Sequence, residues 1–196
     1  FGLVPDDEYE KVFSAMLGHL EQLDYHFDTG IFGTPLLLKV LTDNGRADLA
    51  YRLMNQRDFP GYSYLLDEKN STLWETWDGS GDPGGCGHCH PMFGSVVAWF
   101  YHSLAGIRPD KSKPGMKHFY IAPAPVSDLS YCRASYNTLY GKIISDWHID
   151  ERGNFKFNVE IPVNTSATIV LPQWGKECAK EPIQVLSGSY SFKVLK

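Results

Sequence analysis

The segment Pro35-Leu36-Leu37-Leu38-Lys39-Val40-Leu41 is apolar on nearly every side when it is drawn as a helix. A helix without a polar face is buried, because no side of it suits contact with water. The turn residues Thr42-Asp43-Asn44-Gly45 follow directly and end the helical pattern. We therefore expect a helix over residues 35–41 that other helices cover from both sides.

The helices on either side of this segment are expected to be one-sided. Upstream, Pro5 suits a first helical turn, and apolar residues then recur at the i, i+3, i+4 and i+7 positions. Downstream, a second one-sided helix is followed, after a long loop, by a helix with little polar surface. The apolar residues of the three helices are, in order, Phe13, Met16, Leu17 and Leu20; Ala47, Ala50, Tyr51 and Met54; and Val96, Val97, Trp99, Phe100 and Leu104.

One-sided and buried helices in alternation are typical of an α/α-toroid, in which inner helices are covered on both sides. Four helices are about a third of a closed (α/α)6 barrel, so we expect a partial toroid over residues 1–110. A four-helix bundle is the alternative. It agrees less well with two apolar helices separated by a loop of about 35 residues, since loops of that length are usually functional.

From about Ile107 the apolar period changes to two, which is typical of strands. Residues 108–115 have the composition of a linker. Several short alternating segments follow, and they indicate an antiparallel β-sandwich over residues 111–196. The expected strands cover residues 131–136, 142–149, 155–161, 167–171 and 190–194.

Composition excludes some classes of function. The chain has 196 residues and a formal net charge of −5, so it lacks the basic surface that nucleic acid requires. It has no apolar run of the length that spans a membrane. The first residues do not resemble a signal peptide, and the chain begins without Met, which suggests a processed protein or a piece of a longer one. Its cellular location is left open.

The stretch Leu73-Trp74-Glu75-Thr76-Trp77-Asp78-Gly79 sets one carboxylate between two indole rings. Indole faces stack on the C–H faces of sugars, and apolar surroundings disfavour a charged carboxylate. Glu75 is therefore a candidate acid or base for work on a carbohydrate. The alternative is a solvated loop glutamate beside two tryptophans that only pack.

Two further groups of polar residues are candidates for sugar contacts. His90 precedes Pro91, which suits the start of a helix, so His90 would lie at the positive end of that helix. The alternative is that it simply caps the helix. Asp24, His26 and Asp28 form a second polar cluster between the first two helices, where ordinary capping is an equal explanation.

The pentapeptide Cys86-Gly87-His88-Cys89-His90 fits the C-x-x-C-H pattern of c-type haem attachment, and its first four residues fit a redox motif. The residues before Cys86 form a glycine-rich loop, which suits neither context. A zinc site would require histidines that lie further apart in sequence. We favour a local disulfide or two free thiols, and we expect neither a metal nor a cofactor.

Several segments together resemble the α-L-rhamnosidases of glycoside hydrolase family 78, over essentially the whole chain. They are residues 29–35 (Thr-Gly-Ile-Phe-Gly-Thr-Pro), 41–51, 72–78, 90–94, 141–147 and 161–172. The resemblance implies an (α/α)6 barrel followed by a β-sandwich, and hydrolysis of terminal α-L-rhamnosides with inversion. It also implies that Glu75 is the general base, that His90 contacts rhamnose, and that Trp74 and Trp77 line the pocket.

No segment matches the general acid of that family, and Cys86-Gly87-His88-Cys89 departs from the residues usual there. We therefore expect the C-terminal part of a bacterial α-L-rhamnosidase, inactive alone. Its partners would be a rhamnose-containing glycoside or polysaccharide and the rest of the barrel, with no nucleic acid or membrane. Exposed inner helices would favour a homo-oligomer. The alternatives are a non-catalytic carbohydrate-binding module that uses Trp74 and Trp77, and a c-type haem protein.

Overall fold

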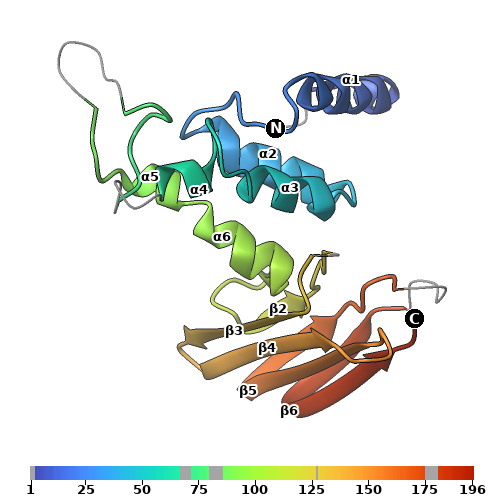
Figure 1. Cartoon of the computed structure of the whole chain (residues 1–196). Helices are drawn as coiled ribbons and strands as arrows, with labels where there is room; N and C mark the ends of the chain where they lie inside the picture. The colour runs from blue at the N-terminus through green and yellow to red at the C-terminus, as the bar shows by residue number, and fades with distance from the viewer. Residues whose placement is uncertain (1–2, 67–71, 80–85, 127, 175–180) are drawn as a thin grey trace. The chain divides into compact units, whose positions relative to one another are not determined.

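The chain divides into two units, residues 1–96 and 97–196, in a computed structural model (Figure 1). The structure describes residues 3–66, 72–79, 86–126, 128–174 and 181–196. The first unit is helical, and the second contains a sheet preceded by short helical turns. Among the described residues, no helix is both long enough and apolar enough to cross a membrane.

The first three helices of the first unit form where the apolar periodicity predicts them, and a short fourth helix lies within the predicted long loop. In the first of them, Leu20 is buried and Phe13, Met16 and Leu17 are partly buried, which confirms a one-sided helix. The elements are the 3-10 turn η1 (Asp6–Glu8) and the helices α1 (Tyr9–Gln22), α2 (Gly33–Asp43), α3 (Ala47–Met54), α4 (Tyr62–Leu65) and α5 (Pro91–Gly94).

Helix α2 differs from the expectation that it is buried on every side. Leu37, Leu38 and Leu41 are buried, and α2 contacts α3. Leu36 and Val40 lie one turn apart on the helix and are 46% and 37% exposed. The expectation of full burial is wrong for this chain, because the described residues cover only one face of α2.

The helix expected around residues 96–104 is divided into shorter pieces. Helix α6 (Val97–Trp99) passes directly into η2 (Phe100–Leu104), a π-helical turn. The N–H of Ala105 donates to the carbonyl of Phe100 at 2.9 Å, which is the i→i+5 spacing of a π turn. Ser103 and Leu104 are buried there, whereas Phe100 is exposed.

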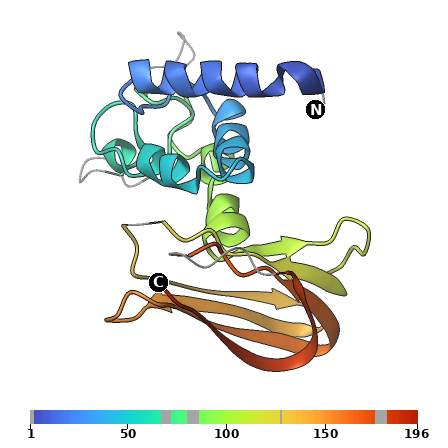
Figure 2. The same ribbon diagram turned by 90° about the vertical axis from the view of Figure 1, so that its right-hand side faces the viewer.

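The six strands in the described part of the second unit belong to one curled sheet, with the order β1-β2-β5-β4-β3 and with β6 paired to β5 (Figure 2). Every pair is antiparallel except β2 with β5. The strands are β1 (Ile107–Pro109), β2 (His118–Ile121), β3 (Tyr131–Thr138), β4 (Gly141–Ile149), β5 (Phe155–Ile169) and β6 (Ile183–Val194).

Strand β5 accounts for most of the difference from the predicted sandwich. The segments 155–161 and 167–171 were expected as separate strands, but they belong largely to one strand of 15 residues. Its pairing with β6 shifts register between Ile161 and Ser166. The first part of β5 pairs with β4 and the last part with β2, so the sheet curls along this strand. Strand β1 also includes residues 108 and 109, which were predicted to belong to the linker.

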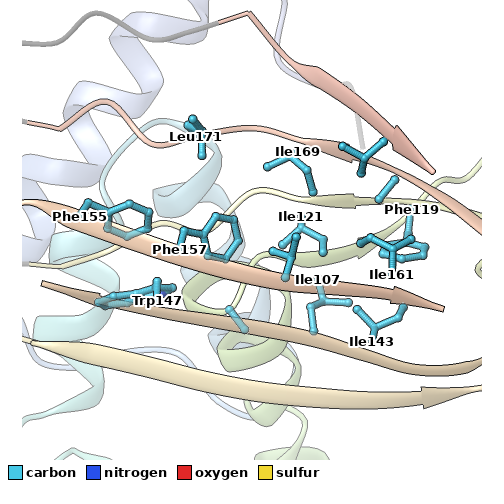
Figure 3. Packing of buried hydrophobic residues seen from close by; sticks show 14 of the residues in the cluster. Ile107, Phe119, Ile121, Ile143, Trp147, Phe155, Phe157, Ile161, Ile169 and Leu171 are labelled. Carbon is cyan, nitrogen blue, oxygen red and sulfur yellow. The ribbon is translucent and has the colours of Figure 1, made fainter. Parts of the chain in front are cut away.

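The core of the second unit lies along the alternating inward side chains of these strands (Figure 3). Phe155, Phe157 and Trp147 are fully buried, as the period of two predicts. The indole N–H of Trp147 donates to the carbonyl of Leu104 at 2.8 Å, which ties the sheet to the end of η2. The helices of the first unit and the sheet of the second confirm the predicted mixture of helix and strand.

Candidate functional site

Two segments on either side of the glycine-rich loop are joined by backbone hydrogen bonds in the first unit. The N–H of Glu75 donates to the carbonyl of Gly87 at 2.8 Å, and the N–H of His90 donates to the carbonyl of Leu73 at 2.8 Å. The hydroxyl of Thr72 also donates to the carbonyl of His88. These bonds bring together residues that are 12 to 17 positions apart in sequence.

The carboxylate of Glu75 is held by the same segment. The N–H of Gly87 donates to Oε2 of Glu75 at 3.0 Å. A β-carbon built on Gly87 would lie 3.4 Å from that oxygen and 3.7 Å from Cδ2 of His90, so both side chains flank this glycine. A carboxylate has several lone-pair positions, and this bond leaves others for a water or a substrate. The structure thus brings Glu75 and His90 to one place.

His90 stands directly before α5, with Pro91 in the first turn, as predicted. It occupies the N-cap position of α5, but its side chain makes no capping hydrogen bond. Its Nδ1 atom is buried and has no hydrogen-bond partner among the described residues. Buried polar atoms are normally satisfied, so this nitrogen suits a partner outside the described part of the chain.

Trp74 lies against His88 and Gly79. Its ring stacks on the imidazole of His88, with centroids 4.9 Å apart and planes 28° from parallel. Gly79 has a φ of +66°, and a β-carbon there would come within 2.1 Å of the Trp74 ring. The close approach therefore requires glycine. The roles of Gly79 and Gly87 depend on these tertiary contacts, and in the sequence only the density of glycines around the motif points to them.

Trp77 packs in an aromatic cluster with Phe27, Tyr62 and Phe93. Its ring centroid lies 5.1 Å from those of Phe27 and Tyr62 and 4.4 Å from that of Phe93. The hydroxyl of Tyr62 donates to the carbonyl of Phe93 at 3.1 Å, and burial raises the pKa of this phenol well above its ordinary value. Trp77 therefore packs against the aromatic side chains beside the Glu75 loop.

The other end of Trp77 joins the loop to the start of α2. Its indole N–H donates to the carbonyl of Thr29 at 2.7 Å. The hydroxyl of Thr29 is 2.9 Å from that of Thr34, which in turn donates to the carbonyl of Gly30. The segment that begins with Thr29 therefore positions the Trp77 side of the loop.

The second polar cluster does not come together as one site. Asp24 forms an ion pair with Arg52 at 3.2 Å, and His26 lies 2.9 Å from Asp58. The remaining member, Asp28, lies 2.6 Å from His19. Each member thus has a different partner, which favours local stabilisation over ligand binding.

The cysteines near the site are separate thiols in the structure. Cys86, Cys89 and Cys132 are free, and Cys178 lies outside the described residues. The thiol of Cys86 donates to the carbonyl of Gly79 at 3.0 Å. In the described part of the chain, no three His, Cys, Asp or Glu side chains form a group that could hold a metal ion.

Comparison with known families identifies both units. Residues 1–104 match the bacterial alpha-L-rhamnosidase 6 hairpin glycosidase domain, and residues 106–185 match the bacterial alpha-L-rhamnosidase C-terminal domain.

Curated relatives agree over most of the chain. An alpha-L-rhamnosidase of Streptomyces avermitilis is 36% identical over 87% of this chain, and one of Formosa agariphila is 30% identical over 100%. The matched regions make up 17% and 22% of those relatives, so the chain spans about a fifth of their length.

Solved structures of alpha-L-rhamnosidases resemble the chain at a similar level of identity. The alpha-L-rhamnosidase from Dictyoglumus thermophilum matches 99% of this chain and 24% of its own, with a TM-score of 0.90 and 34% identity. The Streptomyces avermitilis alpha-L-rhamnosidase complexed with L-rhamnose matches 98% of this chain and 20% of its own, with a TM-score of 0.86 and 33% identity.

Proposed function

Because the chain belongs to the bacterial α-L-rhamnosidase family, we propose that it supplies the general base of a glycosidase that removes terminal α-L-rhamnose with inversion. The observation that carries this proposal is the Glu75 carboxylate, hydrogen-bonded to Gly87 and flanking the same glycine as His90. A carboxylate held by one donor, with other lone pairs left for water, suits the activation of a nucleophile.

In the proposed mechanism Glu75 removes a proton from a water molecule that attacks the anomeric carbon. A second carboxyl group protonates the departing oxygen on the opposite side of the ring. Inverting enzymes hold these two groups roughly 6.5–9.5 Å apart, which leaves room for the water. We assign the acid to another part of the longer parent, because no segment of this chain matches it.

His90 and the two tryptophans are proposed to form one wall of the sugar pocket. The buried Nδ1 of His90 has no partner among the described residues and suits a hydroxyl of the bound sugar. Trp74, stacked on His88, would contact the apolar face of the substrate. Trp77 would support this wall from the aromatic cluster behind it.

The helices of residues 1–110 are proposed to close an (α/α)6 toroid with helices from the rest of the parent. The exposed face of α2, formed by Leu36 and Val40, supports this arrangement, since an inner helix of a toroid is covered on both sides. Residues 111–196 would form the β-sandwich that follows the barrel.

The assignment of Glu75 is tested in the parent enzyme with an aryl α-L-rhamnoside. We expect Glu75→Gln to lower kcat by about 10²–10⁴-fold while rhamnose binding changes little. Azide should restore turnover to Glu75→Ala, because a small anion can attack without a base. The matched control is Glu151→Gln, which changes an exposed glutamate of the second unit. Unchanged turnover in Glu75→Gln would remove Glu75 from the mechanism.

The chain alone is expected to have little activity. Without a positioned acid it should lose about 10²–10⁴-fold of the parent's rate. Normal turnover of the same aryl substrate by residues 1–196 would contradict the proposal that the acid lies elsewhere.

A further inference from the structure

The outward face of β2, β5 and β6 carries a polar depression of about 410 Å³. Along β2, His118 and Tyr120 alternate with Phe119 and Ile121, which face the core (Figure 3). The register pairs these positions with outward residues of β5, which pair in turn with outward residues of β6. The outward residues that line the depression are His118, Tyr120, Ser166, Thr168, Gln184 and Leu186.

A hydrogen-bonded network forms the floor of this depression. The Nδ1 atom of the buried His118 lies 2.7 Å from the hydroxyl of Ser166, and its Nε2 atom lies 2.9 Å from the hydroxyl of Thr168. The amide of Gln184 donates to the same Thr168 oxygen at 2.8 Å. Histidine, two hydroxyls and an amide are thus linked across three strands.

In either protonation state of His118, at least one hydroxyl hydrogen of this network has no acceptor within the network. A neutral imidazole has one N–H and one bare nitrogen. One hydroxyl must therefore donate to the bare nitrogen, while the other receives the N–H and keeps its own hydrogen. A protonated His118 would leave both hydroxyl hydrogens free. No second acceptor for Ser166 or Thr168 occurs within the described ranges. The floor therefore offers a hydrogen that a water molecule or a ligand oxygen can accept.

The rim around this floor favours a neutral ligand that is rich in hydroxyls. Asp110 can only accept and Lys113 can only donate, and their charges balance. Tyr120 is 39% exposed and Leu186 is 72% exposed, so both offer apolar surface beside the polar groups. A sugar ring combines hydroxyls, which donate and accept, with an apolar C–H face.

We propose that this depression binds a single sugar ring of a glycan, with a ring oxygen or hydroxyl accepting from the Ser166–His118–Thr168 network and Tyr120 against the C–H face. The volume of about 410 Å³ lies at the lower end of the range for small-ligand sites, which suits a single ring. All of its residues belong to the second unit, so the site is independent of Glu75. It would hold the glycan while the catalytic site acts elsewhere.

The test is a titration of ¹⁵N-labelled chain 1–196 with the methyl glycosides of L-rhamnose, D-glucose and D-galactose. At least one should give saturable amide shifts around residues 110–120, 166–168 and 184–186. Tyr120→Ala should weaken that binding about tenfold. Ser166→Ala should weaken it less, because it removes one of the two hydroxyls. The control is Tyr131→Ala on β3, since Tyr131 is 67% exposed and does not line the depression.

Folding is checked by the spectrum of each variant, and Tyr120→Phe, which keeps the ring, should bind as the unchanged chain does. Three results would each overturn the proposal. The first is no saturable shift with any of the sugars. The second is binding that Tyr120→Ala and Ser166→Ala leave intact but Trp74→Ala removes. The third is binding of inorganic phosphate in place of sugars, since it would indicate an anion site.

Discussion

Glu75 and Gly87 hold each other through two hydrogen bonds. The N–H of Glu75 donates to the carbonyl of Gly87 at 2.8 Å, and the N–H of Gly87 donates to Oε2 of Glu75 at 3.0 Å. The first bond fixes the backbone below the carboxylate, and the second fixes the carboxylate. A side chain with this many rotatable bonds is otherwise free to leave a catalytic position, so the pair of bonds sets its orientation.

Gly87→Ala in the parent enzyme should therefore lower kcat more than it changes KM. The new methyl group would lie 3.4 Å from Oε2 of Glu75 and 3.7 Å from Cδ2 of His90, in van der Waals contact with both, so it would fill space between them that water or a sugar could otherwise enter. We expect a loss of about tenfold in kcat, measured with an aryl α-L-rhamnoside. Gly30→Ala is the control, because a β-carbon there meets nothing within 4 Å. Equal rates in the two variants would argue against positioning by Gly87.

Gly79→Ala should destabilise this chain and disturb Trp74. The left-handed backbone at Gly79 and the 2.1 Å approach of the new β-carbon to the indole ring act together. Gly45 is the control, because its φ of +73° is close to that of Gly79 but a β-carbon built on it would meet nothing within 4 Å. We expect Gly45→Ala to cost about 1 kcal/mol in urea unfolding. Gly79→Ala should cost at least about 1 kcal/mol more and change the near-ultraviolet circular dichroism.

Trp147→Phe should destabilise the second unit by about 2 kcal/mol. The substitution leaves the carbonyl of Leu104 without the indole N–H and opens space in the core. Trp174→Phe is the matched control, since its N–H donates to the carbonyl of Gly153 at 2.8 Å in a less buried position. Urea unfolding followed by circular dichroism measures both. A smaller loss for Trp147→Phe than for Trp174→Phe would contradict the burial argument.

Acid should weaken the turn between β4 and β5. The side-chain amide of Asn154, followed by its backbone N–H and that of Arg152, holds the pKa of Asp150 at about 2, below its ordinary value of 3.8. A depressed pKa stabilises the fold at pH above 3.8, and this contribution is lost as the pH falls from about 4 to about 2. The free energy of unfolding should decrease over that window. Asp150→Asn should flatten the decrease, and an unchanged pH profile would exclude Asp150 as its source.

The exposed face of α2 should cause this chain to self-associate. Leu36 and Val40 form an apolar strip that the described residues leave open. We expect concentration-dependent association in sedimentation velocity, reduced by the double substitution Leu36→Gln and Val40→Thr. The control is Leu139→Gln, because Leu139 is exposed but lies in the turn between β3 and β4. A monomer at high concentration would refute this prediction.

The sequence by itself determined the helices of residues 5–54, the core strands and the residues worth testing. Their periodicity is local, and the motif around Glu75 and the helix start at Pro91 are short, so neighbouring residues suffice to predict them. The sequence also contains Gly79 and Gly87, but it does not show which side chains lie against them. A glycine's role depends on what approaches it.

Only the tertiary structure decided what those residues contact. Pairing of residues 73–75 with 87–90, the stacking of Trp74 on His88 and the place of Trp77 among three aromatic rings all join positions far apart in sequence. The curl of the sheet likewise follows from the register shift in β5, which depends on β2, β4 and β6 together. Hydrogen-bond register and ring packing are properties of pairs of segments, and a periodic pattern within one segment does not specify its partner.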